Sequence, residues 1–429
     1  MKKTVLKVKN FLKVFGPGVI TGAADDDPSG IATYTQTGAK FGYGQLWTVI
    51  VMLPLMTAIQ EACARIGAVT GHGLAAVIKT NYSKKVLYAA VLLVVVANTI
   101  NIGADIGAIA AAAQLLIPVN FIILTLGFTA LILILEIFTT YRVYSRILKW
   151  LALTLLAYPL TVFMVNQPWK TIFVATFWPH VELNFEFFFI ITGVLGTTIS
   201  PYMFFWQASQ EVEEEKELHL TNRYGRSRIG VKFIKNLRID NFLGMVFSEI
   251  ATWSIIVVAA TVLHQNGITN VSSAADAAKA LEPLVQTFPH AGFLAKLIFA
   301  TGIIGLGLLG IPVLSGSAAY ALSEAFNLKS GLNLKVKKAY GFYGVITVAT
   351  IIGLMINFIG IDPIKALVFT AVFNGVAAVP LIFLIARIAR NQKIMGEYRS
   401  GWLSNTVVWI AFMVMLASAV AMFYTLARG

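Results

Sequence analysis

The stretch Ala23-Ala24-Asp25-Asp26-Asp27-Pro28-Ser29-Gly30 decides the fold. It lies inside a long apolar run that begins at Val14. Proline inside a helix removes one backbone hydrogen bond and its ring clashes with the preceding turn, while glycine and serine lower the helix propensity further. Consecutive carboxylates inside such a run are costly, and in a membrane span they mark a functional site. The sequence therefore predicts a helix that is broken at this acidic segment.

The composition places this segment in a membrane protein. Of the 429 residues, 58% are hydrophobic and only 12% are charged, whereas a soluble domain carries about 25% charged residues. Apolar runs recur from Val14 to Ala427, so we expect the whole chain to be embedded in a bilayer. No small-residue cleavage site follows the lysine-rich N-terminus, which is therefore not expected to be a cleavable signal.

Eleven segments are long and apolar enough to cross a bilayer, which takes ~20 mostly apolar residues. They are residues 14–37, 45–69, 86–116, 121–140, 144–166, 185–212, 240–264, 292–323, 339–358, 364–386 and 404–427. The sequence thus predicts an all-α membrane protein with eleven transmembrane helices.

Basic residues alternate between the two sides of these segments. With the N-terminus in the cytoplasm, most lysines and arginines lie in cytoplasmic segments, as the positive-inside rule requires. The exceptions among the 33 are Lys40, Lys170, Lys279, Lys296, Lys365 and Arg428. This pattern explains the net charge of +13 without nucleic acid. Short loops favour a bacterial inner membrane, and we expect a monomer whose partners are the lipid bilayer and a small substrate.

A second break occurs in the sixth span, at Gly196-Thr197-Thr198-Ile199-Ser200-Pro201-Tyr202. Span one begins inside and span six begins outside, so residues 14–166 and 185–386 form two five-helix units of opposite orientation. Each unit starts with a broken helix, which is the pattern of transporters whose substrate site lies at the midplane between two discontinuous helices. Residues 1–13 are expected to form a cytoplasmic N-terminus and residues 404–427 a peripheral helix.

The candidate ligands in the two breaks all carry oxygen. They are Asp27 with Asp25 or Asp26, the Thr197 carbonyl and the Ser200 hydroxyl. Oxygen ligands suit hard ions such as Mg²⁺, Ca²⁺ and Mn²⁺, whereas sulfur selects later transition metals. The single cysteine, Cys63, excludes a cysteine-cluster metal site. Such an oxygen site also binds Na⁺, and one aspartate can pair with an organic amine, so these residues leave the cargo open.

Several motifs resemble the NRAMP divalent-metal transporters. They are Gly16-Pro17-Gly18, Asp27-Pro28-Ser29-Gly30, Gly67-Ala68-Val69-Thr70-Gly71 and the break in span six. The resemblance covers most of the chain and is specific in spans one, two and six. It implies a LeuT-like fold with a 5+5 inverted repeat, in which helices one and six are broken. It also implies inward transport of a metal ion by alternating access.

Departures from the family pattern change the expected cargo. The family's Asp-Pro-Gly-Asn reads Asp-Pro-Ser-Gly here, so Gly30 stands where the family has an asparagine ligand. The family's Ala-Val-Ile-Met-Pro-His has Thr197 for Ala, Ser200 for the Met ligand and Tyr202 for His. The lost thioether favours transition metals over Mg²⁺, and Mg²⁺ usually keeps several waters. The resemblance thus points to the NRAMP-related magnesium transporter branch or a close sister branch.

The expected cargo is therefore a divalent cation, with Mg²⁺ preferred and Mn²⁺ second. The expected metal site is formed by Asp27, Gly30, Thr197, Ser200 and Asp26. The second-tier candidates are Asp25, Tyr202, Asn101, Asp105 and Asn374. For Asn374 in span ten, a place at the site and an interhelical hydrogen bond are equally open.

Proton coupling is expected to be weak or absent. The family's third helix carries an Asp and a Glu, which align with Asn101 and Ala104, and neither of these titrates. Asp105 follows directly and either relays a proton or serves helix packing. The histidine of the family's sixth helix is replaced by Tyr202.

Other carboxylates have plainer explanations. Glu61 and Arg65 are four residues apart and are expected to form an ion pair on a helix surface. Glu136 and Glu249 are each expected to pair with a neighbour rather than to bind the cargo. Glu211 is expected to lie at a solvated helix end rather than in an acidic exit vestibule.

Besides an enzyme, three alternative functions are considered: a second kind of metal transporter, an amine transporter, and a receptor or scaffold. No Walker A, Rossmann or catalytic-triad pattern occurs, so we expect neither an enzyme nor a bound cofactor. A proton-coupled Mn²⁺/Fe²⁺ NRAMP transporter is the main alternative, and the absence of methionine at position 200 argues against it. A cation-coupled transporter of an organic amine would use Asp27 as the counter-charge. The acidic broken helix disfavours a receptor or scaffold.

Overall fold

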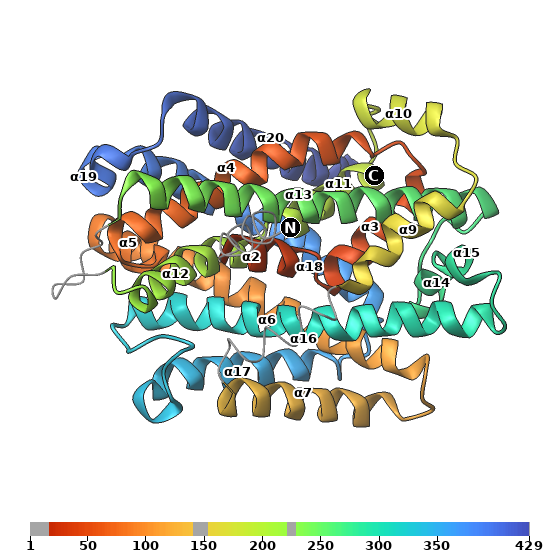
Figure 1. Cartoon of the computed structure of the whole chain (residues 1–429), viewed down its shortest axis with the longest axis horizontal. Helices are drawn as coiled ribbons and strands as arrows, with labels where there is room; N and C mark the ends of the chain where they lie inside the picture. Colours follow the sequence, from red (N-terminus) through yellow and green to blue (C-terminus); the bar gives the residue numbers. More distant parts are fainter. Residues whose placement is uncertain (1–16, 140–152, 221–228, 429) are drawn as a thin grey trace, which may run out of the picture.

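The computed structural model of the protein describes residues 17–139, 153–220 and 229–428. In these ranges the chain is helical and has no strand. Long helices run side by side along the long axis of the molecule (Figure 1). The longest are α4 (Trp47–Thr70), α6 (Lys84–Gln114), α7 (Phe121–Phe138), α13 (Val231–Val262), α16 (Ala291–Ala325), α18 (Pro363–Arg390) and α20 (Trp402–Arg428). The expectation of an all-α protein is confirmed.

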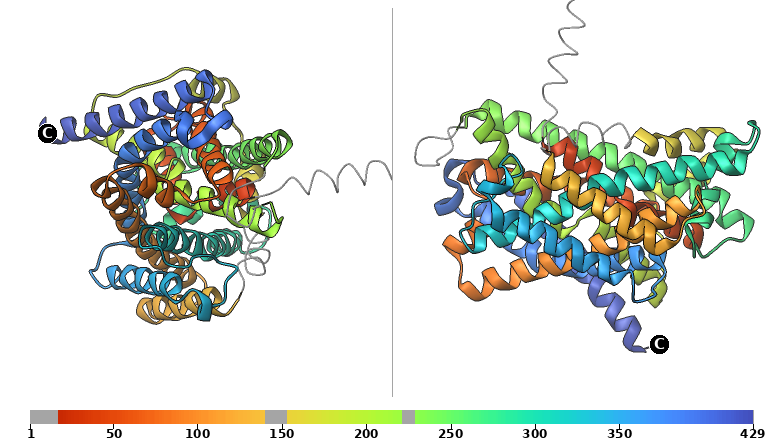
Figure 2. Two further views of the ribbon diagram at one scale, coloured as in Figure 1. Left: turned by 90° about the vertical axis from the view of Figure 1, so that its left-hand side faces the viewer. Right: turned by 90° about the horizontal axis from the view of Figure 1, so that it is seen from below.

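Short helices close the ends of the bundle. They are α5 (Leu74–Asn81), α9 (Ala157–Met164), α10 (Trp169–Phe177), α14 (Ala274–Lys279), α15 (Glu282–Val285) and α19 (Gln392–Met395). The helix α17 (Tyr340–Ile356) instead runs along the bundle and packs on α6, α7 and α16. The helices α9, α10, α14 and α15 gather at one end and α5 and α19 at the other (Figure 1). The last part of α20 projects from the bundle (Figure 2).

Eight helical segments of the described residues are long and apolar enough to cross a membrane, with the two parts of span six counted as one. Two shorter apolar segments, Leu153–Met164 and Tyr340–Ile356, fall below that length. The fifth expected span begins in residues 140–152, which lie outside the described part. The count of eleven spans therefore stays a prediction.

Two spans are broken where the sequence predicts. The first consists of α2 (Pro17–Asp25) and α3 (Pro28–Phe41), and the sixth of α11 (Phe185–Thr198) and α12 (Pro201–Glu217). A proline opens the second half in both cases. Its fixed φ suits the first helical position, and its missing N–H would have had no partner there. Each proline thus disfavours continuation of the first half-helix and also starts the second half-helix.

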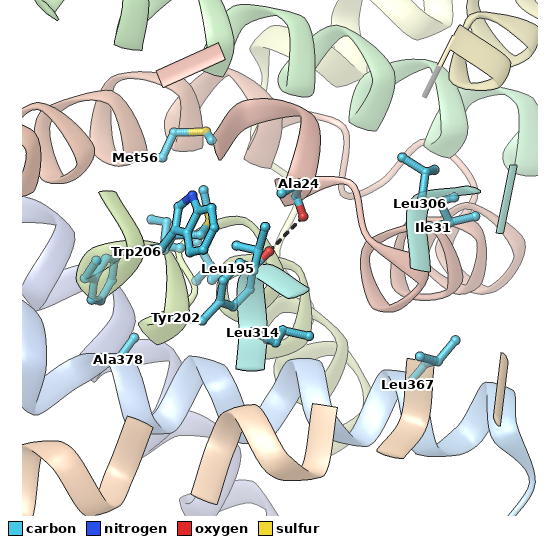
Figure 3. Packing of buried hydrophobic residues seen from close by; sticks show 14 of the residues in the cluster. Ala24, Ile31, Met56, Leu195, Tyr202, Trp206, Leu306, Leu314, Leu367 and Ala378 are labelled. Atoms are coloured by element: carbon cyan, nitrogen blue, oxygen red, sulfur yellow. Dashed lines mark hydrogen bonds between the residues drawn. The ribbon is translucent and has the colours of Figure 1, made fainter. Parts of the chain in front are cut away.

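The two broken spans lie in the middle of the bundle. Both α2 and α3 pack against α13, and α12 packs between α4 and α16. On the far side, α6 and α16 separate the centre from α7 and α17 (Figure 1). The buried side chains around the second break include Leu195, Tyr202 and Trp206 (Figure 3). The centre of the protein is therefore where backbone groups have been released from helical hydrogen bonds.

Two helices extend beyond the expected membrane spans. The seventh span was expected at 240–264, but α13 already begins at Val231, and α18 continues to Arg390 beyond the expected end at 386. The added turns carry lysine and arginine, which an apolar-run criterion excludes. A helix need not end at the membrane surface, because its hydrogen bonds continue equally well in water.

Candidate metal site at the two helix breaks

Asp27 caps the helix that follows the first break. It has extended backbone angles (φ −65°, ψ 175°), and its Oδ1 accepts hydrogen bonds from the Gly30 amide at 3.0 Å and the Ser29 hydroxyl at 2.6 Å. Aspartate is a preferred N-cap, and its negative charge is favourable at the positive end of the helix dipole. The local sequence thus holds this carboxylate at the start of α3.

A second set of donors holds the other oxygen of Asp27. The Asn101 amide of α6 donates to Asp27 Oδ2 at 3.1 Å and to Asp105 Oδ2 at 3.4 Å. The Asn374 amide of α18 donates to Asn101 Oδ1 at 3.5 Å. On the α16 side, a Cβ at Gly310 would lie 3.3 Å from the Cβ of Asp27, so this helix approaches closely. Four helices therefore converge on one buried carboxylate.

The two breaks contact each other through side chains. The hydroxyls of Ser29 and Thr197 lie 3.2 Å apart, and those of Tyr34 and Thr198 lie 2.7 Å apart. The Tyr202 hydroxyl donates to the Ala24 carbonyl at 2.9 Å, across the gap between the two spans (Figure 3). Carbonyls released at the end of α2 thus find partners on the other broken span, as buried backbone groups must.

Most of the residues predicted for the site lie together. Asp27, Asn101, Asp105 and Asn374 form one chain of hydrogen bonds. Gly30 lies beside Thr197, because a Cβ on this glycine would be 3.4 Å from the Thr197 hydroxyl. Asn374 forms a hydrogen bond between helices to Asn101, which in turn donates to Asp27.

Other predicted residues point elsewhere. The Ser200 hydroxyl donates to the Gly196 carbonyl at 2.9 Å, within its own span. Asp25 accepts from Ser248 of α13 at 2.5 Å, and Asp26 lies on the same α13 side of the break. Ser29 was not predicted as a site residue, although it joins Asp27 to Thr197. The feature of the sequence that could have identified Ser29 as a site residue is its hydroxyl, which stands two residues after the helix cap Asp27.

The expectations for the other carboxylates have mixed outcomes. Glu136 accepts from Ser315 at 2.6 Å, as expected, but neither oxygen of Glu249 has a hydrogen-bond partner. Glu211 is only 1% exposed and accepts from Gln207 at 2.9 Å, so the expected solvated helix end is wrong. The residue is buried because α12 continues between α4 and α16 instead of leaving the bundle.

The Glu61–Arg65 pair exists, with an N–O distance of 2.9 Å. Arg65 is 1% exposed, however, so the pair is buried rather than on a helix surface. Arg238 of α13 contacts the second oxygen of Glu61 at 2.9 Å, and Arg65 also donates to Ser400 at 2.7 Å. The pair therefore ties α4 to α13 and to the segment before α20.

The donor set around Asp27 is suited to a hard cation. The side chains that contact this carboxylate carry hydroxyl and amide groups, without sulfur or imidazole. Asp27 is 2% exposed and forms no ion pair with the described lysines and arginines. Within the described ranges, no three His, Cys, Asp or Glu side chains are placed to share a metal ion. A cation here would combine one carboxylate with neutral oxygens and water.

Curated relatives match almost the whole chain. Residues 18–425 match the Nramp family, described as natural resistance-associated macrophage protein-like. A protein of Caldanaerobacter subterraneus named divalent metal cation transporter MntH is 25% identical over 98% of this chain and 95% of its own length. A protein of Listeria innocua with the same name is 26% identical over 97% of this chain and 92% of its own.

Solved structures share the fold. A manganese transporter of Eremococcus coleocola has a TM-score of 0.76 at 14% identity, covering 98% of this chain and 87% of that one. The nucleobase-cation-symport-1 transporter Mhp1 has a TM-score of 0.56 at 13% identity, covering 97% and 93%. These matches confirm the LeuT-like arrangement with two broken helices.

The expectations of an integral membrane protein and of a protein that is not an enzyme are confirmed by these relatives and by the apolar spans. With the match over residues 18–425, the chain belongs to the Nramp family.

Proposed function

We propose that this protein transports divalent metal ions into the cell by alternating access, with Mg²⁺ preferred over Mn²⁺. The observation that carries the proposal is the Asp27 carboxylate, held by Ser29, Gly30 and Asn101 in a buried site without soft ligands. The relatives named divalent metal cation transporters support the substrate class. The carboxylate, with no sulfur or imidazole among the side chains that contact it, supports Mg²⁺ within that class.

The proposed cargo site is centred on Asp27, with the Thr197 carbonyl and the Gly30 position beside it. Asn101, Asp105 and Asn374 orient Asp27 from the side of α6 and α18. Ser200 and Tyr202 shape the second break, and Asp26 and Asp25 lie behind the first. Because few protein groups contact the ion, we expect it to keep several waters, which suits Mg²⁺.

The same proposal includes the orientation and the coupling. The N-terminus is cytoplasmic, the membrane is a bacterial inner membrane, and the protein works as a monomer with repeats at 14–166 and 185–386. Proton coupling is weak or absent, because Asn101 replaces a titratable residue of the family next to the site. Uptake by purified protein in liposomes, followed with a pH dye in the lumen, tests the coupling, and acidification in proportion to metal uptake would refute it.

The cargo is tested in the same liposomes with Mg²⁺, Mn²⁺ and Ca²⁺. Wild-type protein is expected to take up Mg²⁺, and Asp27→Ala to be inactive. Glu136→Gln is the matched control, since it also neutralises a buried carboxylate but lies in α7, bonded to Ser315. Absence of flux for every divalent ion would overturn the proposal.

A proton-coupled manganese transporter is the second candidate. One solved structure with this fold, from Eremococcus coleocola, is described as a manganese transporter. Mn²⁺ uptake that is unaffected by excess Mg²⁺ and that acidifies the lumen would favour this candidate over the first.

A further inference from the structure

One long helix bridges both halves of the first broken span. α13 packs along α2 and along α3 (Figure 1). The contact is backbone to backbone: a Cβ at Gly22 of α2 would lie 2.4 Å from the Gly244 carbonyl, and one at Gly38 of α3 would lie 2.4 Å from the Ile256 carbonyl. Neither position tolerates a side chain. The part of α13 between Gly244 and Ile256 therefore lies across the gap at residues 25–27.

That part of α13 carries polar side chains. Ser248 donates to Asp25 Oδ2 at 2.5 Å, and Glu249 interacts electrostatically with Asp26 and with Asp25. Thr252 lies one turn further along the same helix. All five residues are at most 3% exposed. The gap is thus closed on this side by carboxylates and hydroxyls rather than by apolar packing.

Most of the carboxylate oxygens in this cluster have no hydrogen-bond partner. They are Asp25 Oδ1, Asp26 Oδ1 and both Oε atoms of Glu249. Among the described residues, no lysine, arginine or histidine forms an ion pair with the three carboxylates. Buried carboxylates persist only when they are compensated, and each unsatisfied oxygen carries the full cost of its lost hydration. A bound cation or bound protons would supply the missing compensation. Saturable Na⁺ binding distinguishes the cation from the protons.

The charge of that cation follows from the geometry. In the described ranges no three carboxylate, imidazole or thiol groups are placed to share one ion, so at most two of these carboxylates hold it and no cage for a divalent ion is formed. A monovalent ion needs less charge and accepts a mixture of carboxylate, hydroxyl and carbonyl oxygens. The carboxyl end of α2 at Asp25 adds the negative end of a helix dipole, and such half-helix ends coordinate Na⁺ in transporters of this kind.

We propose that the Asp25 and Glu249 carboxylates, supported by Asp26, Ser248 and Thr252 beside them, form a second cation site, which binds Na⁺ and is separate from the cargo site at Asp27. The two sites share one unwound segment, because Asp25 and Asp27 are two residues apart. An ion held by Glu249 and Asp25 fixes the position of that segment against α13. Na⁺ bound on one face of the break therefore sets the geometry of the cargo site on the other.

The test measures Na⁺ binding directly. Purified full-length protein in detergent is assayed for binding of radioactive Na⁺, and its thermal unfolding is compared in NaCl and in choline chloride at equal ionic strength. Wild-type protein is expected to bind Na⁺ saturably and to unfold at higher temperature in NaCl, because an ion that binds only the folded state stabilises it. Equal unfolding temperatures in the two salts, without saturable binding, would overturn the proposal.

Variants locate the site. Glu249→Gln is expected to abolish the Na⁺ response, and the Ser248→Ala, Thr252→Val double variant to weaken Na⁺ binding about tenfold, the size of loss expected for indirect ligand support. Glu136→Gln, which removes a buried carboxylate elsewhere, is expected to keep the full response. If Glu249→Gln does not fold, the Ser248→Ala, Thr252→Val double variant tests the site instead. An unchanged Na⁺ affinity of this double variant would contradict the proposed site.

The cargo variant separates this proposal from the proposed function. Asp27→Ala is expected to bind Na⁺ as the wild type does, while losing divalent uptake. Loss of Na⁺ binding in Asp27→Ala, or displacement of Na⁺ by Mg²⁺ in simple competition, would mean that one site serves both ions. Absence of divalent uptake in the wild type, with Na⁺ binding intact, would refute the proposed cargo and leave the Na⁺ site standing.

Discussion

The two faces of the break in the first span differ sharply, although their carboxylates are consecutive in the chain. On the face toward α6, Asp27 receives hydrogen bonds from Ser29, Gly30 and Asn101. On the face toward α13, the cluster of Asp25, Asp26 and Glu249 receives a hydrogen bond from Ser248, and several of its oxygens have no partner.

The difference shows two ways to keep charge in a membrane interior. A carboxylate with three donors is held in one position before any ion arrives, which lowers the cost of ordering it upon binding. Carboxylates with few donors would depend on the proposed ion for their stability. The Asp27 face is therefore suited to select a cargo by geometry, and the α13 face to respond to whether an ion is present.

The largest effect is expected from Asp27→Ala, which removes the carboxylate on which the proposed cargo site is centred. Divalent uptake in liposomes should fall by more than about 100-fold, since even indirect ligand support is worth 10–100-fold in metal affinity. If Asp27→Ala retains uptake while Glu249→Gln loses it, the assignment of the two faces is reversed.

Gly22→Ala tests whether α13 must touch the first half-helix. The added Cβ would lie 2.4 Å from the Gly244 carbonyl, a backbone atom that cannot rotate away. Overpacking of this kind costs about 1–3 kcal/mol, so the thermal unfolding temperature should fall. Gly127→Ala in α7 is the matched control, because nothing lies within 4 Å of a Cβ there. An equal unfolding temperature for both variants would mean that α2 moves away from α13 freely.

Asn101→Ala removes one of the three donors to Asp27 and leaves the carboxylate in place. A hydrogen bond to a charged group is worth about 1.5–3 kcal/mol, so the KM for the divalent ion should rise about tenfold or more. The KM is read from initial uptake rates. Asn98→Ala is the control, since Asn98 lies on the same helix but donates to the Leu314 carbonyl. Equal KM values for the two variants would remove Asn101 from the site.

Ser200→Met gives the smallest expected change and asks whether α12 presents this position to the ion. The serine hydroxyl now bonds the Gly196 carbonyl. A thioether that reaches the ion should raise the affinity for Cd²⁺ relative to Mg²⁺ by about tenfold, because soft ligands select soft ions. Ser200→Ala controls for the lost hydrogen bond, and an unchanged Cd²⁺ preference in Ser200→Met would place position 200 outside the cargo site.

Local chemistry determined much of this protein from the sequence alone. Pro28 and Pro201 disfavour a continuous helix, and both breaks were predicted from these prolines together with the neighbouring aspartates, glycines and serines. Pro54, Pro312 and Pro380 stand inside unbroken helices, so proline alone does not set a break. The apolar runs predicted the long helices, and Asp27 before Pro28 predicted a capped helix start. The oxygen-only character of the two breaks was also evident, because it depends on which residues are present and not on how they pack.

Only the tertiary structure decided which way each carboxylate faces. An unwound segment has no helical period, so the sequence carried no signal that Asp27 points to α6 and Asp25 to α13. The direction is set by helices far away in the chain: Asn101 binds Asp27 from 74 residues away, and Ser248 binds Asp25 from 223. Gly22 and Gly244 bring α2 and α13 into backbone contact, and that approach leaves Glu249 buried without a partner. Local structure follows from neighbours in sequence, whereas the balance of buried charge follows from neighbours in space.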